Sequence, residues 1–218
     1  MKKKYINTFF KRLSKNIPNP KSDLKYKNNF TLLIAVLLSA QSTDTGVNKA
    51  TKKLFLLANN PQSILNLGLT KLKSLIKTIG LYNSKAKNII NLSKILIEKY
   101  NGKIPKTRED LVSLPGVGRK TANVVLNIAF KKATIAVDTH IFRVSNRTKI
   151  ALGKNPLDVE LSLEKIVPEQ YKMNAHHLLI LHGRYVCKAR NPECYKCVVN
   201  DLCLFKNKNF SLKKNATV

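Results

Sequence analysis

The sequence predicts an all-α protein, and three observations support that fold class. Apolar residues recur at helical spacing along most of the chain, as they do over residues 47–58. Alternating apolar and polar residues, the pattern typical of strands, are scarce. Clusters of glycine, proline and asparagine interrupt the helical pattern and leave room for helices of about 8 to 18 residues. We therefore expect helices that pack on other helices.

The first long apolar segment covers residues 30–41 and is apolar on all sides, which predicts a helix buried in the core. A later segment, residues 84–100, places its apolar residues on one face and lysines on the other. Thr107, followed three residues later by Asp110, is typical of the start of a capped helix. This pair predicts a short helix that ends at Leu114.

The segment LPGVGRKTANVVL, residues 114–126, joins that short helix to another helix. Gly116 and Gly118 flank a single residue, which indicates backbone that bends tightly or is closely approached. Arg119 and Lys120 open the second helix, and the amino end of a helix attracts phosphate. Glycine and proline are also the usual residues of an ordinary turn between helices. The complete segment favours a hairpin that grips one DNA backbone without reading bases.

An earlier segment, TIGLYNSKAKNII, is a faint copy of that hairpin. Gly80 aligns with Gly116, but Tyr82 replaces the second glycine, so we expect weaker phosphate binding there. Its apolar tip, Ile79 and Leu81, would either press into a groove or tuck into the core.

The chain carries 40 lysine and arginine residues against 12 aspartate and glutamate residues, a formal net charge of +28. Such a charge is typical of proteins that bind a polyanion. A solvated basic surface is the alternative, because lysine and asparagine also accumulate in proteins from AT-rich genomes. The most apolar run, residues 32–38, is far shorter than the ~20 residues that span a bilayer. The amino-terminal segment has no export signal, so we expect a cytosolic, reduced protein.

Four cysteines, Cys187, Cys194, Cys197 and Cys203, follow the spacing C-x6-C-x2-C-x5-C. Disulfides are rare in cytosolic proteins. Four thiolates satisfy a tetrahedral zinc ion, although zinc sites more often use two C-x2-C pairs. Four thiolates also hold iron-sulfur clusters. The spacing alone leaves zinc and an iron-sulfur cluster as open alternatives. The chain has four histidines, and we assign none of them to chemistry.

Taken together, these motifs make the sequence resemble endonuclease III, a family of DNA glycosylases and abasic-site lyases in the helix-hairpin-helix superfamily. The resemblance runs from about Phe30 to Phe205. It rests on six motifs in order: LLSAQSTD, IGLYNSKA, LPGVGRKTANVVL, VDTHIFRVSNR, LHGRYVC and the four-cysteine tail. It implies two helical domains of the helix-hairpin-helix DNA glycosylase fold, with a C-terminal iron-sulfur cluster loop.

The resemblance also implies how the chain divides. Residues 22–132 would form a helical barrel domain with the hairpin, and residues 1–21 and 133–211 an iron-sulfur cluster domain. Residues 212–218 would be a basic tail. DNA would lie in the cleft between the domains, and a [4Fe-4S] cluster would be held by all four cysteines.

The catalytic roles implied by the resemblance fall on Lys120 and Asp138. Lys120 stands where the family has its nucleophilic lysine, which attacks C1′ of the damaged nucleotide and forms a Schiff base. Asp138 stands where the family has its catalytic aspartate. Taken alone, Lys120 would be an ordinary phosphate contact, and Asp138 an N-cap of the helix THIFRVSNRT. We expect Asp138 to fill both roles and the two residues to face each other at the mouth of the cleft.

The implied DNA contacts include residues that fill the gap left by a flipped base. Gln41 and Leu81 match those positions, and an ordinary loop or core role is the alternative for each. Cations near the cysteines would make a second contact to the backbone or would simply be solvated. The predicted DNA-binding residues are Gln41, Leu81, Gly116, Val117, Gly118, Arg119, Thr121, Lys188, Arg190 and Lys196.

The resemblance implies a bifunctional enzyme of base excision repair that removes oxidised pyrimidines and nicks 3′ to the site by β-elimination. Its partner would be double-stranded DNA with a damaged base or an abasic site, and it would act as a cytoplasmic bacterial monomer without a membrane. An adenine or mismatch glycosylase is the rival enzyme, although adenine glycosylases usually lack a lysine at the position of Lys120. A non-catalytic DNA-binding protein is the rival of another class, and the pair of Lys120 and Asp138 argues against it. Val112 stands where some relatives have an acidic residue, which alters the charge beside the hairpin.

Overall fold

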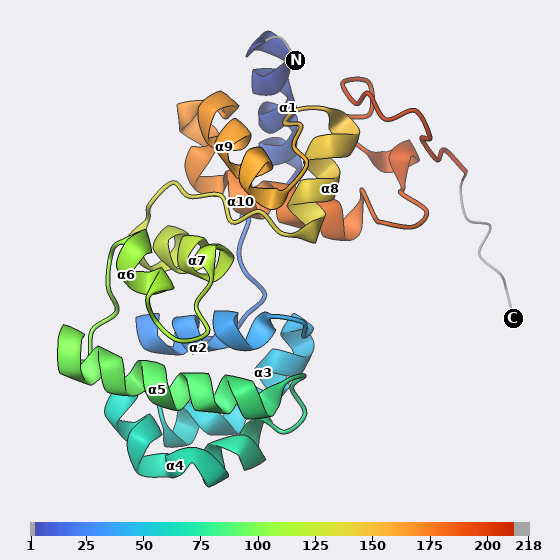
Figure 1. Cartoon of the computed structure of the whole chain (residues 1–218). Coiled ribbons are helices and arrows are strands. Elements are labelled where there is room, and N and C mark those ends of the chain that lie inside the picture. Colours follow the sequence, from blue (N-terminus) through green and yellow to red (C-terminus); the bar gives the residue numbers. More distant parts are fainter. Residues whose placement is uncertain (1–2, 212–218) are drawn as a thin grey trace, which may run out of the picture. The chain divides into compact units, whose positions relative to one another are not determined.

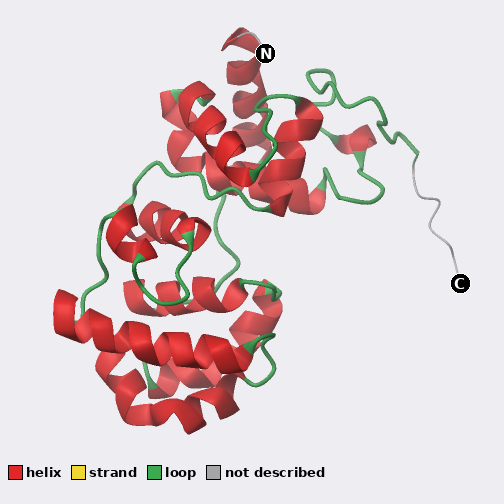
Figure 2. Cartoon of the chain, in the orientation of Figure 1, coloured by secondary structure: helices red, strands yellow, loops and turns green. Residues whose placement is uncertain are grey.

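The computed structural model describes residues 3–211, and every regular element in that range is helical (Figure 1, Figure 2). The predicted all-α class is confirmed. The chain forms two compact units: residues 22–132 make up one, and the residues before and after them make up the other. The predicted basic tail, residues 212–218, lies outside the described part of the chain. Over the described residues, the helices are too short or too polar to cross a membrane.

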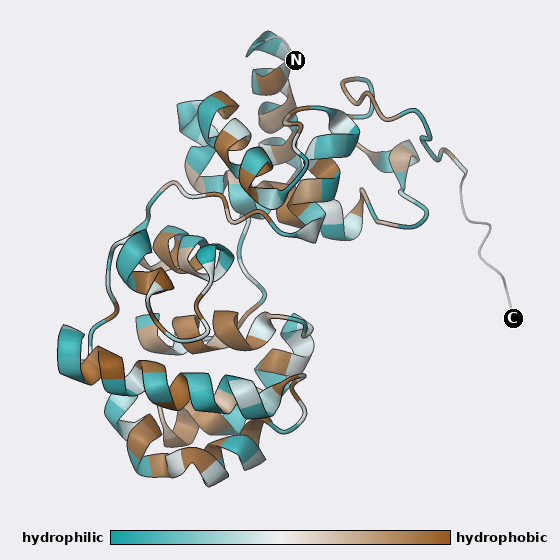
Figure 3. Cartoon of the chain, in the orientation of Figure 1, coloured by the Kyte–Doolittle hydropathy of each residue, from teal (hydrophilic) through white to brown (hydrophobic). Residues whose placement is uncertain are grey.

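The unit of residues 22–132 is built around one buried helix. α2 packs against α3, α5 and α7, and its residues 30–38 are all buried, as the sequence predicted. Figure 3 shows α2 as mostly hydrophobic and α5 as a mixture of hydrophobic and hydrophilic residues. Each fully buried leucine or isoleucine contributes about 1.5–3 kcal/mol, so α2 anchors this unit. Its helices are α2 (Asn29–Ser39), α3 (Asp44–Leu57), α4 (Pro61–Ile76), α5 (Tyr82–Tyr100), α6 (Arg108–Val112) and α7 (Arg119–Phe130).

The short helix α6 begins as predicted and ends earlier than predicted. Thr107 caps it, because its Oγ1 accepts a hydrogen bond of 3.2 Å from the amide of Asp110. The helix ends at Val112 and not at Leu114. The reason is Pro115, whose ring disfavours the helical conformation in the residue before it.

Helix α4 contains a kink that the sequence reasoning did not anticipate. Gly68 interrupts the helix with a φ of 76° and a ψ of 163°, a backbone conformation that glycine adopts without a steric penalty. The helix α4, which packs against both α3 and α5, is therefore bent at this glycine.

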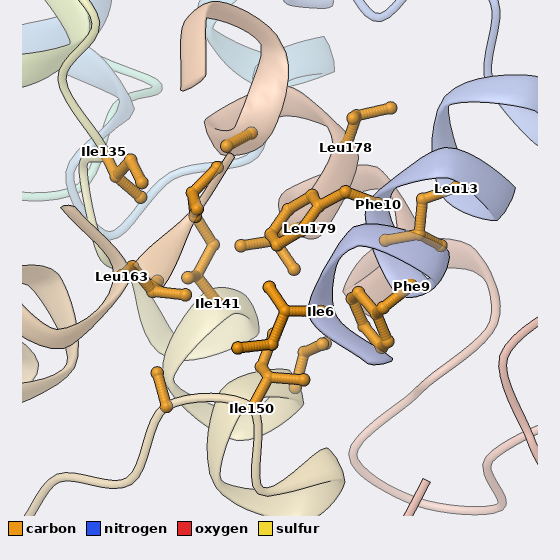
Figure 4. Close-up of a cluster of buried hydrophobic side chains, with 14 of the residues drawn as sticks. Ile6, Phe9, Phe10, Leu13, Ile135, Ile141, Ile150, Leu163, Leu178 and Leu179 are labelled. Atoms are coloured by element: carbon orange, nitrogen blue, oxygen red, sulfur yellow. The ribbon is translucent and has the colours of Figure 1, made fainter. Parts of the chain in front are cut away.

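The other unit joins the amino-terminal helix to the carboxyl-terminal half of the chain. α10 packs against α1 and α8, and Figure 4 shows Phe10, Ile141 and Leu179 meeting in the core from these three helices. Ile135, in the irregular segment before α8, is buried in the same core. Its elements are α1 (Lys3–Asn16), α8 (Thr139–Thr148), α9 (Pro156–Ile166), α10 (Glu169–Tyr185) and the short 3-10 helix η1 (Cys194–Lys196).

Candidate functional site

A tight hairpin joins α6 to α7. The amide of Val117 donates to the carbonyl of Leu114 over 3.0 Å, which closes the turn, and both side chains are buried. Gly116 has a φ of 78°, and a Cβ atom there would lie 2.7 Å from Nδ2 of Asn88 on α5. The fold therefore requires glycine at position 116, both for its backbone conformation and for the close approach to α5.

Gly118 is required for neither of these reasons. Its φ of −86° suits any residue, and a Cβ atom there would meet no atom of the described residues within 4 Å. Gly118 is also the N-cap of α7, a helix that no side chain of the described residues caps. The amino end of α7 is thus left open on its outer side.

The first residues of α7 add positive charge to that open end. Arg119 and Lys120 are the first two residues of the helix, and both are exposed. Thr121 follows them and is half-buried. A helix amino end carries a partial positive charge of about half a unit, so the helix and the two cations together suit an anion such as a phosphate.

Asp138 lies in the other unit, at the start of α8. Its Oδ1 accepts hydrogen bonds of 2.9 Å from the amides of His140 and of Ile141. The N-cap role predicted for Asp138 is therefore present. The buried residues Ile135 and Val137 anchor the segment that leads to it, so the carboxylate is held on both sides.

Gln41 and Leu81 occupy two exposed turns with unusual backbone. Their φ angles are 56° and 58°, in the left-handed region. This conformation costs a residue with a Cβ atom about 1–2 kcal/mol, and such residues cluster at functional sites. Leu81 is 61% exposed, whereas its neighbour Ile79 is 3% exposed. The apolar tip of the faint hairpin is thus divided between the core and the surface.

The four cysteines are free, half-buried thiols that line one cavity together with His182. Burial, with a smaller contribution from the other three thiols, raises the pKa of Cys197 to about 11. Four thiolates gathered in this way repel one another unless a cationic group is bound. Four cysteine thiolates are the donor set that holds iron-sulfur clusters, so the lining of this cavity suits such a group.

Two arginines of α8 hold the loop that carries the cysteines. Arg143 Nε donates to the carbonyl of Cys187 over 3.0 Å. Arg147 donates to the carbonyls of the next two residues of the loop over 2.6 and 2.8 Å. The guanidinium of Arg147 also lies 4.7 Å from the centre of the Phe205 ring and 3.9 Å from Sγ of Cys187. The loop is therefore fixed to α8 at both of its ends, with positive charge beside a thiol.

Glu193 alters the expectation for the basic residues of this loop. Its carboxylate forms ion pairs with both Lys188 and Lys196. Hydrogen bonds from these two lysines hold the pKa of Glu193 below its ordinary value. Arg190 is exposed on the same loop. A phosphate would have to compete with Glu193 for the two lysines, whereas Arg190 faces no such competition from Glu193.

Comparison with known proteins decides the family. Residues 34–169 match the model of the HhH-GPD superfamily of base excision DNA repair proteins. The chain belongs to this superfamily. Residues 187–203, a range with all four cysteines, match the iron-sulfur binding domain of endonuclease III. The resemblance drawn from the motifs is confirmed: the chain is a DNA glycosylase and abasic-site lyase of base excision repair, and its cofactor is a [4Fe-4S] cluster.

Individual members of the HhH-GPD superfamily match almost the whole chain. Endonuclease III from Haemophilus influenzae is 61% identical over 197 residues, which cover 90% of this chain and 93% of that protein. Endonuclease III from Escherichia coli is 59% identical over the same shares. Among solved structures, a trapped endonuclease III-DNA covalent intermediate in an estranged-adenine complex has a TM-score of 0.89 at 45% identity. The match covers 94% of this chain and 96% of that one. DNA binding follows from these likenesses.

The geometry argues against one predicted DNA contact of this HhH-GPD protein. Val117 is 4% exposed, and its amide already donates to Leu114. Neither its side chain nor its amide is therefore available to a phosphate. Val117 closes the hairpin from the inside, which its place between two glycines did not reveal.

The sequence reasoning also missed residues that serve the site from behind. His182 is buried, which lowers its pKa to about 4, and its Nε2 lies 3.7 Å from Sγ of Cys197. The neutral ring thus borders the cysteine cavity, and the motif LHGRYVC, in which His182 precedes Cys187, was the available signal. Asn88 and Glu193 were missed as well, because their roles depend on contacts that no spacing in the sequence marks.

Proposed function

We propose that this chain removes oxidised pyrimidines from double-stranded DNA and cuts the strand 3′ to the resulting site, with Lys120 as nucleophile and Asp138 as its electrostatic partner. One observation carries the proposal: an exposed lysine stands in the first turn of α7, two residues after a glycine that nothing in the described chain crowds. A backbone phosphate bound at this helix end would bring the neighbouring sugar within reach of the amine.

An amine at this position supplies covalent catalysis. The neutral Nζ of Lys120 attacks C1′, the bond from C1′ to the base breaks, and the base leaves with a proton. The sugar ring then opens as O4′ takes a proton from the nitrogen side, which leaves a Schiff base between Nζ and C1′. The Schiff base makes the 2′ proton acidic. Loss of that proton expels the 3′ phosphate, and water finally releases the lysine.

Asp138 supports this reaction as a carboxylate held in a fixed orientation. The amides of His140 and Ile141 engage its Oδ1, and Oδ2 accepts no hydrogen bond from the described residues. The open oxygen would stabilise the positive charge that develops on the sugar as the bond to the base breaks.

The damaged base must leave the helical stack before an amine can reach C1′, which costs a few kcal/mol. We assign Gln41 and Leu81 to the gap that the base leaves behind. Their exposure and their left-handed backbone support this assignment, because the side chains stand out from tight turns and not along helices.

We propose that the ligands of the cluster are Cys187, Cys194, Cys197 and Cys203. The [4Fe-4S] cluster, when bound, supplies a structural cross-link and no chemistry of the reaction. Arg143 and Arg147 fasten the surrounding loop to α8, so the loop would present Arg190 to a second phosphate. Lys188 and Lys196 would also contact that phosphate once its oxygens replace the carboxylate of Glu193 as their partner.

Borohydride trapping tests the proposal directly. The native protein should cut a duplex with one thymine glycol, and borohydride should trap protein and DNA as one covalent species. Lys120→Gln should abolish both, while the affinity for abasic-site DNA falls by only about 1 kcal/mol, the value of a surface charge contact. Lys131→Gln, at the exposed carboxyl end of the same helix, is the matched control and should trap normally.

Trapping of Lys120→Gln at the normal rate would show that the nucleophile is another residue. Removal of adenine from a mismatched duplex, without action on thymine glycol, would favour the rival adenine glycosylase. We further infer that the protein works on the bacterial nucleoid in the cytoplasm. We also infer that it acts as a monomer, because the proposed catalytic and binding residues all come from one chain. Sedimentation of the protein bound to a short duplex tests this stoichiometry.

A further inference from the structure

Lys85 is the one lysine that is buried among the described residues, with 6% of its surface exposed. Its Nζ donates to the carbonyl of Leu38 over 2.9 Å and to the carbonyl of Ala40 over 2.5 Å. Oγ of Ser42 lies 3.5 Å from the same nitrogen. An ammonium group has three donors, and here all three are used between α5 and the end of α2.

The position of Lys85 is unfavourable for its own helix. Lys85 is the fourth residue of α5, and a cation near a helix amino end opposes the helix dipole. Burial also lowers the pKa of its amine. The benefit lies in the neighbouring helix, because the last carbonyls of α2 have no partner within that helix and attract a cation. Lys85 therefore ties the carboxyl end of α2 to the amino end of α5, which Figure 1 shows at the same end of this unit.

The two backbones tied by Lys85 are those of the proposed gap-filling residues. Gln41 directly follows Ala40, and Leu81 precedes α5 as its N-cap. Both have left-handed backbone, which persists only where the surroundings hold it. The two turns also lie close together, because a Cβ atom added at Gly80 would lie 3.5 Å from the carbonyl oxygen of Gln41.

We propose that Lys85 is a positioning residue that locks the turns of Gln41 and Leu81 into one rigid wedge, ready to enter the duplex when a base is flipped. The inference rests on the proposed function, since it assumes that these two residues fill the gap. A wedge ordered before binding loses no conformational freedom on entering DNA. Lys85 touches neither DNA nor the reacting atoms, and it acts through the backbone of the residues that do.

The test is Lys85→Met, which keeps the length of the side chain and removes its charge and donors. Base removal from a duplex with thymine glycol opposite adenine should slow by about tenfold or more, because a pair must be opened. Borohydride trapping on a preformed abasic site should fall by only about threefold or less, since no base remains to be flipped. Lys94→Met, on the exposed side of the same helix, is the matched control and should behave like the native protein in both assays.

A double substitution separates positioning from general stability. If Lys85 acts through the wedge, Lys85→Met combined with Leu81→Ala should remove the base no more slowly than the slower single variant, because coupled residues are not additive. Multiplied effects, equal losses in both assays or no loss at all would each overturn the inference. If Lys85→Met does not fold, Lys85→Gln is scored by the same criteria. A native protein that is inactive in both assays would instead refute the proposed function.

Discussion

Gly116 and Gly118 stand one residue apart, yet they are glycine for different reasons. Gly116 meets Asn88 and has a left-handed backbone, so the protein itself excludes a side chain there. At Gly118 the space beside the backbone is open, so the fold gives no reason for glycine there, and we propose that a bound phosphate does. The sequence pattern G-x-G cannot distinguish the two cases.

This difference predicts opposite outcomes for two alanine substitutions. Gly116→Ala should destabilise the fold by about 1–3 kcal/mol, because it adds strain and a clash. Gly118→Ala should leave the melting temperature unchanged or slightly higher, and should weaken binding to abasic-site DNA by about tenfold, or 1.4 kcal/mol. Thermal denaturation and DNA titration check both. Normal DNA affinity of a folded Gly118→Ala protein would contradict the assigned phosphate contact.

At the scale of elements, α8 has two tasks. Asp138 caps its amino end, and the arginines of its later turns hold the cysteine loop. The helix thus connects the proposed catalytic carboxylate to the metal centre through a few turns of regular backbone.

The cap and the chemistry of Asp138 can be separated by two substitutions. Asp138→Ala removes the cap and should cost about 0.5–2 kcal/mol of stability, whereas Asp138→Asn keeps the cap and should cost little. Both should slow base removal by about 10² or more, because neither stabilises positive charge. Chemical denaturation and single-turnover kinetics measure the two effects. Normal kinetics of the Asp138→Asn protein would show that Asp138 caps the helix and has no role in catalysis.

The cysteine loop should depend on its cluster, and the hairpin should not. Cys197→Ser should speed hydrogen exchange over residues 187–205 and weaken DNA binding, because the loop loses its cross-link. Exchange in α2 and α7 of the other unit should stay unchanged. Protection of the loop equal to that of the native protein would show that the contacts of Arg143 and Arg147 suffice without the cluster.

The sequence predicted the features that depend on residues close together in the chain, and it did not predict those that depend on residues far apart in the chain. The buried helix α2, the cap at Thr107 and the cap at Asp138 follow from local patterns, and all three are present. The sequence prediction placed the end of α6 too late, because it left out that Pro115 disfavours helical backbone in the residue before it. The roles of Lys85 and Glu193 could not be predicted, because each depends on partners whose positions are set by packing. The metal was predictable only through the resemblance, since the spacing alone left zinc open.

At the scale of the whole molecule, the charge of +28 acts on any duplex that approaches, but only placed cations form lasting contacts. Arg119 and Lys120 stand at a helix end that suits phosphate, and Arg190 stands exposed on the cysteine loop. Lysines scattered over other faces are expected to speed association without fixing the register of the DNA.

Binding should therefore depend steeply on salt. The logarithm of affinity should fall linearly with the logarithm of salt concentration, with a slope of about −0.9 for each phosphate contact. Arg190→Gln should reduce the slope by about 1. Lys11→Gln, on the exposed face of α1, is the control and should leave it unchanged. A slope near zero for the native protein would rule out the phosphate contacts.

The division of the chain has a consequence for how the protein is made. α1 belongs to the unit completed by residues from 133 onward, so it leaves the ribosome long before α8 and α10 exist. Phe9 and Phe10 are fully buried in the finished core. They have no core to pack into while residues 22–132 are translated. The inserted unit has all of its helices in sequence and can fold as it emerges. Synthesis thus completes the hairpin first and the metal centre last, and the first helix is the segment most in need of a chaperone.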